Sequence, residues 1–158
     1  MKSRSEIRKN GQQAMAALYG FGKYLAKSSL EKSLHQLIEF RVSQINGCAF
    51  CLDMHSKDLL ADGETAQRLL VLDAWREAPF YTERERAALA WAEAVTKLER
   101  GQVPDTIFEE AKKQFSDQEL MDLTMAVLAI NCWNRLNIAF PVPEAVGTYQ
   151  PGQYAVQA

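Results

Sequence analysis

Apolar residues recur every three or four positions along most of this chain, and no stretch alternates apolar and polar residues as a strand does. This pattern predicts an all-α fold. A first helix is expected over about 5–27, with a kink near Gly20 because glycine weakens a helix interior. A second helix is expected over 30–45, where leucine and isoleucine residues fall on one face.

Helix start and stop signals divide the rest of the chain. Thr82 with Glu85, and Ser116 with Glu119, have the spacing of a capping box, in which each residue accepts a hydrogen bond from the other's backbone N–H group. Further helices are expected over about 48–62, 64–75, 82–100, 104–115 and 120–140. The sequence therefore predicts a helical bundle of about six or seven helices.

The length and composition fit one compact domain. The chain has 158 residues, 47% of them hydrophobic, which suffices for one buried core and is short for two domains. We therefore expect a single helical domain over 1–158. After Arg135 the chain carries one charged residue, Glu144, and three prolines, which predicts an irregular arm over about 138–158. The arm's aromatic residues favour packing on a neighbouring subunit, and hence a homo-oligomer.

Charge and hydropathy exclude several classes of partner. A formal net charge of -2 gives no basic field for a phosphate backbone, so nucleic acid is not an expected partner. The uncharged stretch 123–134 is shorter than the roughly 20 apolar residues that a membrane span needs. The basic N-terminus is not followed by the apolar segment of a secretory signal, so we expect a cytoplasmic protein. Three cysteines fit this reducing compartment if two act catalytically and Cys132 stays free.

The segment 48–55, Cys-Ala-Phe-Cys-Leu-Asp-Met-His, carries the strongest chemical signal in the chain. On a helix, Cys48, Cys51 and His55 point within about 60° of one another and can share one small pocket. The preceding Asn46 and Gly47 are residues typical of a helix start, which places both cysteines near the first turn. The positive end of the helix dipole favours a thiolate over a thiol there.

A thiolate beside a second thiol indicates redox chemistry. Thiolates attack electrophilic oxygen or sulfur far better than thiols do, and the three-residue spacing lets the partner sulfur close a disulfide. The expected product state is therefore the Cys48–Cys51 disulfide. This chemistry requires no metal and no organic cofactor.

The same residues allow a structural zinc site as an alternative, with Cys48, Cys51 and His55 as ligands. Such a site needs four ligands, and the other His and Cys residues of the chain, His35 and Cys132, do not form a second pair. Attachment of c-type haem requires a histidine directly after the second cysteine, where this chain has leucine. A thioredoxin fold requires a βαβ pattern that is missing here.

Three segments together resemble the alkylhydroperoxidase AhpD-like branch of the carboxymuconolactone decarboxylase family. They are Ser43–His55, Glu64–Leu69 and Asn131–Arg135. The resemblance covers most of the chain, and the Cys-X-X-Cys-X-X-X-His core is specific in an all-helical setting. It implies all-α subunits that assemble into trimers or hexamers.

The resemblance also implies roles for individual residues. Cys51 corresponds to the peroxidatic nucleophile, Cys48 to the cysteine that resolves the sulfenic acid, and His55 to a member of the proton relay. The family usually has a glutamate twelve residues before the first cysteine, where this chain has Gln36. Glutamine orients a group without cycling a proton, so Glu39, one helical turn further on, is a second candidate for this function.

The function implied is that of a thiol-dependent peroxidase. It would reduce a small hydroperoxide, such as an alkyl hydroperoxide, through a dithiol/disulfide cycle driven by an external dithiol reductant. A disulfide oxidoreductase or redox sensor is an alternative that the sequence does not separate from it. A decarboxylase acting on a lactone-bearing acid does not call for the cysteine pair, and a zinc-stabilised binding module predicts one stoichiometric metal ion. Next to Gln36 on the second helix, His35 is expected at the surface or an interface.

Overall fold

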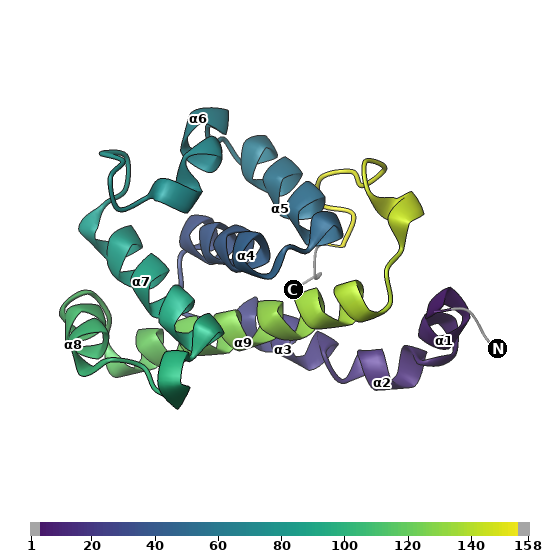
Figure 1. The fold of residues 1–158 in the computed structure, drawn as a ribbon, viewed down its shortest axis with the longest axis horizontal. Helices are drawn as coiled ribbons and strands as arrows, with labels where there is room; N and C mark the ends of the chain where they lie inside the picture. The colour runs from purple at the N-terminus through teal and green to yellow at the C-terminus, as the bar shows by residue number, and fades with distance from the viewer. Residues whose placement is uncertain (1–3, 155–158) are drawn as a thin grey trace.

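In a computed structural model, residues 4–154 are described, and α-helices make up most of them (Figure 1). The helices are α1 Arg4–Asn10, α2 Gln12–Ala16, α3 Tyr19–Leu25, α4 Lys32–Asn46, α5 Ala49–Ala61, α6 Ala66–Leu70, α7 Glu83–Lys97, α8 Asp105–Gln114 and α9 Asp117–Ala139. Short 3₁₀ turns lie at η1 Leu72–Ala74, η2 Glu99–Gly101 and η3 Pro143–Ala145. Residues 4–154 contain no strand, so the all-α prediction is confirmed.

The core of the molecule forms around α4, which packs against α5, α7 and α9 (Figure 1). Ile38 and Val42 of α4 are fully buried, as are Leu89 of α7 and Leu123 of α9. The apolar faces of α5, α7 and α9 pack against α4, which is the arrangement that the three- and four-residue spacing favours. No helix within residues 4–154 combines the length and the apolar character needed to cross a bilayer.

The helix starts follow the capping boxes. The Thr82 hydroxyl accepts from the Glu85 backbone N–H at 3.2 Å, and the Glu85 carboxylate accepts from the Thr82 N–H at 2.8 Å. Ser116 and Glu119 form the same reciprocal pair at the start of α9. Both predicted capping boxes are therefore confirmed. Helix α7 ends at Lys97, a few residues before the predicted end, because Leu98 adopts a left-handed conformation with φ 43°.

The N-terminal segment differs from the single helix expected over 5–27. It forms α1, α2 and α3, with breaks around Gly11 and between Ala16 and Tyr19, and Gly20 lies inside α3. Within these three helices only Met15 and Leu25 are buried. Because tertiary packing supplies most of the stability of a protein helix, so little buried surface does not hold a long helix together.

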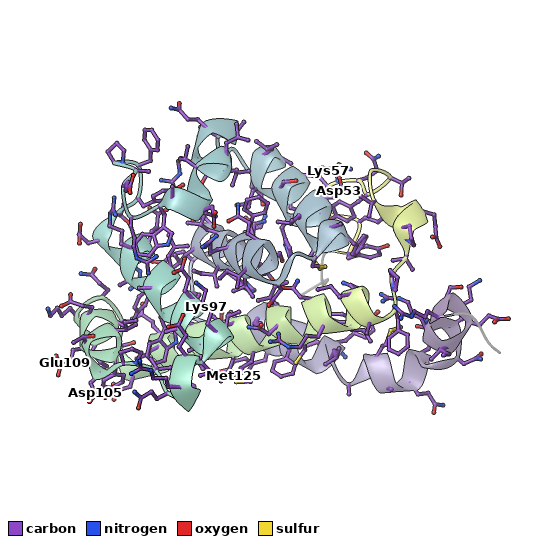
Figure 2. All side chains as sticks on the ribbon, viewed as in Figure 1. Asp53, Lys57, Lys97, Asp105, Glu109 and Met125 are labelled. Atoms are coloured by element: carbon purple, nitrogen blue, oxygen red, sulfur yellow. A yellow bond between two sulfur atoms is a disulfide. The ribbon has the colours of Figure 1, made fainter. Side chains whose placement is uncertain are left out.

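The C-terminal arm folds back onto α5 of its own chain. Helix α9 continues to Ala139, and the described part of the arm ends at residue 154, so 155–158 of the predicted arm lie outside the described residues. Asp53 and Lys57 point from α5 toward the arm (Figure 2), where they contact Gly147 N and Tyr149 O at 2.9 and 3.2 Å. Tyr149 is 3% exposed. The expectation that the aromatic residues need a neighbouring subunit is thus wrong for Tyr149, which packs intramolecularly.

Candidate active site

The redox motif begins at the corner between α4 and α5. Gly47 closes α4 in the left-handed conformation, with φ 69°, and the Cys48 N–H bonds to the Ser43 carbonyl at 3.1 Å. Glycine adopts this backbone conformation without strain, which allows the sharp reversal. Cys48 is then the N-cap of α5, and its Sγ accepts from the Cys51 N–H at 3.4 Å. Asn46, which we expected at the helix start, is instead the last residue of α4.

Cys48 and Cys51 form a disulfide with a Cα–Cα distance of 5.3 Å. Both residues are 1% exposed. An attacking thiolate must contact a sulfur atom, so reduction of this bond requires side chains around it to move. The third cysteine, Cys132, is free and partly exposed on α9.

A network of side-chain amides fastens the corner to α9. The Asn46 Nδ2 group donates to Asn131 Oδ1 at 3.0 Å and to Asn134 Oδ1 at 2.9 Å. Asn134 Nδ2 donates in turn to the Ser43 hydroxyl at 3.0 Å. Asn131 and Asn134 therefore join α9 to the corner between α4 and α5.

Asn137, one turn beyond Asn134 on α9, contacts the redox pair directly. Its Nδ2 lies 3.4 Å from Cys51 Sγ, and the residue is 8% exposed. The sequence reasoning missed this residue. The signal available was the recurrence of asparagine at 131, 134 and 137, which puts three amides on one face of the helix.

His55 lies one turn after Cys51 on α5 and is buried, with 6% of its surface exposed. Its Nδ1 is 3.6 Å from Glu39 Oε2, and the other carboxylate oxygen is 3.4 Å from His35 Nε2. Glu39 of α4 thus lies between two imidazoles. The structure brings the candidate Glu39 to His55, and it brings in His35, which we had expected at the surface or an interface.

Burial dominates the electrostatics of His55. Removal from water lowers the pKa of the imidazole below its ordinary value of 6.5, although Glu39 and Asp58 favour the charged form and oppose this shift. The ring is therefore neutral at pH 7. In the tautomer that carries its proton on Nδ1, 3.6 Å from the Glu39 carboxylate, Nε2 is a buried nitrogen without a hydrogen-bond partner. Such a nitrogen is able to accept a proton.

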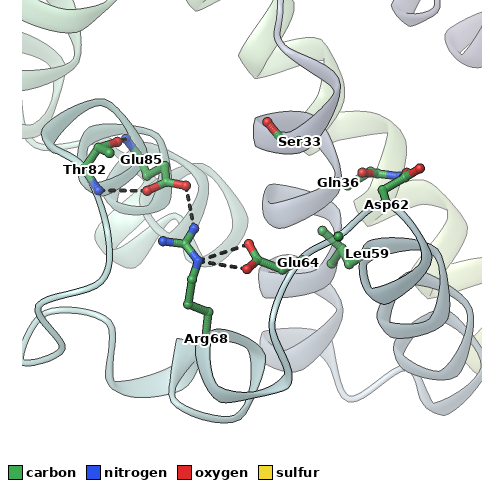
Figure 3. Close-up of a pocket in the computed structure, with 9 residues that line it drawn as sticks. Ser33, Gln36, Leu59, Asp62, Glu64, Arg68, Thr82 and Glu85 are labelled. Atoms are coloured by element: carbon green, nitrogen blue, oxygen red, sulfur yellow. Dashed lines mark hydrogen bonds and ion pairs between the residues drawn. The ribbon is translucent and has the colours of Figure 1, made fainter.

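Gln36 occupies a different place. Its amide donates to Asp62 Oδ2 at 2.7 Å, on the outer side of α4. Together with Ser33, Glu64 and Arg68 it lines a cavity of about 320 Å³ (Figure 3). Arg68 there is paired with two glutamates. The structure therefore does not bring Gln36 to the cysteine pair.

A second cavity of about 500 Å³ lies between α4, α5 and α6, and its lining is largely apolar, with Phe40, Leu52, Leu60 and Leu69. Neither cavity is lined by a residue of the 48/51 disulfide or by His55. Within residues 4–154, no three His, Cys, Asp or Glu side chains are arranged to ligate one ion. While they are joined to each other, the two sulfur atoms cannot serve as thiolate ligands.

The chain is similar in sequence and in fold to known proteins. A sequence model of the carboxymuconolactone decarboxylase family matches residues 12–94, just over half of the chain. The uncharacterised protein YdfG of Bacillus subtilis strain 168 is 39% identical over 127 residues, which span 80% of this chain and 86% of that protein.

Solved structures share the fold. A protein of unknown function from Agrobacterium tumefaciens, ATU0492, whose suggested role is that of the antioxidant defence protein AhpD, superposes with a TM-score of 0.82 and 43% identity. The superposition covers 88% of this chain and 95% of that one. The debrominase Bmp8 superposes with a TM-score of 0.74 over 89% of this chain and 76% of its own, at 23% identity. That likeness shows a shared fold.

Proposed function

Because the chain belongs to the carboxymuconolactone decarboxylase family, as an AhpD-like member, we propose that it is a thiol-dependent peroxidase. It would reduce small hydroperoxides through the Cys48/Cys51 pair. The observation that carries this proposal is the buried disulfide at the start of α5, one turn from a neutral imidazole. A redox-active dithiol needs both parts, a second sulfur within bonding distance and a group that moves a proton.

The first step consumes the hydroperoxide. His55 accepts the proton of the Cys51 thiol, directly or through water, and the resulting thiolate attacks the terminal oxygen of the hydroperoxide. The S–O bond forms as the O–O bond breaks, and the electron pair of the broken bond leaves with the alkoxide. The imidazolium returns the proton to the alkoxide, which departs as an alcohol. Cys51 is now a sulfenic acid.

The second step restores a stable state. The Cys48 sulfur attacks the sulfenic sulfur of Cys51, so that the S–S bond forms and the hydroxyl group leaves as water. This condensation protects Cys51 from irreversible oxidation. An external dithiol then reduces the disulfide by exchange and supplies the two electrons of the cycle. The balance is one hydroperoxide and one dithiol converted to one alcohol, one water and one disulfide.

Glu39 supports the relay by holding His55. The carboxylate faces Nδ1, which leaves Nε2 as the proton acceptor, and it favours the imidazolium that forms during the first step. Asp58 acts on the charged ring in the same sense.

Peroxide consumption with a dithiol reductant tests this proposal. We expect Cys51→Ser to abolish turnover, and His55→Asn to slow it by roughly 10²- to 10⁴-fold because one positioned proton transfer is lost. Cys132→Ser is the matched control, since that cysteine lies outside the disulfide, and it should turn over at the wild-type rate. Circular dichroism verifies that each variant keeps its helices. Wild-type rates in Cys51→Ser would refute the assignment.

A further inference from the structure

One polar atom of the Asn137 side chain contacts the redox pair, and the other has no hydrogen-bond partner. Its Nδ2 donates to Cys51 Sγ at 3.4 Å, whereas its Oδ1 is buried and accepts no hydrogen bond. The large majority of buried side-chain polar atoms in proteins have a hydrogen-bond partner, and an unsatisfied one costs free energy. An orphaned acceptor beside a reactive sulfur therefore calls for a reason.

The neighbouring amides of α9 show how a purely structural asparagine looks. Asn131 donates to Thr96 Oγ1 and to a backbone carbonyl, and its Oδ1 accepts from Asn46. Asn134 donates to a serine hydroxyl, and its Oδ1 accepts from Asn46 as well. Both residues use the donor and the acceptor of the amide for packing. Asn137 lies on the same face of the same helix and leaves its acceptor free.

We propose that Asn137 is a catalytic residue, whose Nδ2 group stabilises the Cys51 thiolate and whose Oδ1 accepts the O–H group of the incoming hydroperoxide. This inference rests on the peroxidase function proposed above. It assigns a ligand to the orphaned oxygen, namely a molecule with a free –OOH group.

The donor half acts on the charge of the sulfur. A disulfide sulfur is a weak hydrogen-bond acceptor, and a thiolate is a strong one because it carries a full negative charge. The N–H···S contact therefore strengthens when the pair is reduced and Cys51 ionises. A hydrogen bond to the charged form of a thiol lowers its pKa, which raises the fraction of reactive thiolate.

The acceptor half acts on the substrate. The oxygen that the thiolate attacks is the one that carries the hydroperoxide's single hydrogen atom. An O–H···Oδ1 bond from that oxygen would therefore hold the reacting atom next to Cys51 Sγ, because both amide atoms belong to the same rigid group. Such positioning of two reacting atoms is a recognised source of rate enhancement. The chemical balance of the step is unchanged: the S–O bond forms, the O–O bond breaks, and the alkoxide takes the proton held by His55.

The test separates the two halves in a protein whose single thiol is Cys51, made with Cys48→Ser and Cys132→Ser. In this background, the pH dependence of alkylation by iodoacetamide gives the pKa of Cys51 without any peroxide. Asn137→Leu, which keeps the branched shape of the side chain and removes both polar atoms, should raise that pKa by about one to two units, the size expected for one hydrogen bond to a charged group. The rate constant for sulfenic acid formation with tert-butyl hydroperoxide, corrected for the thiolate fraction, should fall a further 10-fold or more.

Asn134→Ser is the matched structural control. It weakens the amide network and should lower the melting temperature without moving the pKa of Cys51. If Asn137→Leu does not fold, Asn137→Ser takes its place and should give a smaller shift in the same direction. An unchanged pKa together with an unchanged corrected rate would overturn the inference. If Cys51 does not react with hydroperoxide at all in the protein that keeps Asn137, the proposed function is overturned. The pH dependence of alkylation would still show whether the Asn137 Nδ2 group lowers the pKa of Cys51.

Discussion

Glu39 lies between His55 and His35. The Glu39 carboxylate and the His35 imidazole have opposite effects on the pKa of His55. The carboxylate favours protonation of His55, while His35 and burial disfavour it, and the net result is a pKa below 6.5. A histidine that is neutral when folded takes up a proton more readily when unfolded. The stability that the neutral ring supports is therefore full above pH 6.5 and declines as the pH falls below that value toward the folded pKa. The site is set for a base at neutral pH.

Exchange of Glu39 for glutamine tests this arrangement at the residue scale. Glu39→Gln removes the charge that favours the imidazolium and should slow peroxide turnover by roughly tenfold or more, since one pKa unit corresponds to a factor of ten. Gln36→Ala is the matched control on the same helix, and it should leave turnover unchanged because Gln36 contacts Asp62 on the outer side. Steady-state rates at pH 7.5 provide the comparison. A greater loss in Gln36→Ala than in Glu39→Gln would contradict the relay.

The site residues that the sequence could supply are those close together along the chain. Spacing alone put Cys48, Cys51 and His55 on one face of a helix. Glu39 became a candidate because the family resemblance pointed to position 36, one helical turn before it. Asn137 is 86 positions from Cys51, and its role depends on how α9 crosses the corner between α4 and α5. The spacing of the three asparagines indicates a shared helix face, but no local pattern reveals that crossing, so the sequence alone could not assign this face to Cys51.

At the scale of elements, α5 is held from three directions. Gly47 ties it to α4, the amides of α9 fix the corner, and the C-terminal arm covers its outer side. Asp58 is the main anchor of the arm, because one carboxylate accepts from the Tyr149 hydroxyl and from Gly152 N, each at 2.9 Å. Burial, together with the nearby Asp58 carboxylate, raises the pKa of Tyr149 from 10.0 to about 12.

Removal of this anchor should release the arm. Asp58→Ala leaves the Tyr149 hydroxyl and the Gly152 N–H without their acceptor, and we expect amide hydrogens of residues 147–154 to exchange at least tenfold faster with deuterium. Tyr149→Phe keeps the ring and loses one hydrogen bond, so its effect should be smaller. In the wild type, docking should be full below pH 10 and weaken as the pH rises from 10 toward 12, because a raised tyrosine pKa stabilises the neutral, folded form. Unchanged protection in Asp58→Ala would contradict the anchor.

Local signals predicted the helices well where they were strong. The two capping boxes gave the starts of α7 and α9, and the helix expected over 48–62 ends within one residue of the end of α5 at Ala61. The prediction of one helix over 5–27 was wrong, although the apolar periodicity is present, because the segment buries little surface. Periodicity shows which face of a helix is apolar and does not show whether another element packs on that face. The predicted subunit contact was wrong for Tyr149 for a related reason, since an aromatic residue indicates burial without indicating the surface that buries it.

For the whole molecule, the packing of the helices determines how other molecules gain access to the Cys48–Cys51 disulfide. Helix α4 lies among α5, α7 and α9 (Figure 1), and the disulfide at its end is almost fully buried. In the proposed cycle, a small hydroperoxide and a dithiol would therefore enter through local movement around the corner. The fold by itself does not choose the reaction, because the debrominase Bmp8 shares it, so the assignment depends on the residues around Cys51.

The rate at which hydroperoxide oxidises the fully reduced protein tests the central claim most directly. Rapid mixing with one equivalent of an alkyl hydroperoxide, followed by acid quenching and peptide mass analysis, gives both the rate and the linkage. We expect two thiols to disappear per hydroperoxide within seconds, with a link between Cys48 and Cys51 and with Cys132 still a thiol. Oxidation that takes hours would contradict the peroxidase account and favour a disulfide oxidoreductase or redox sensor instead.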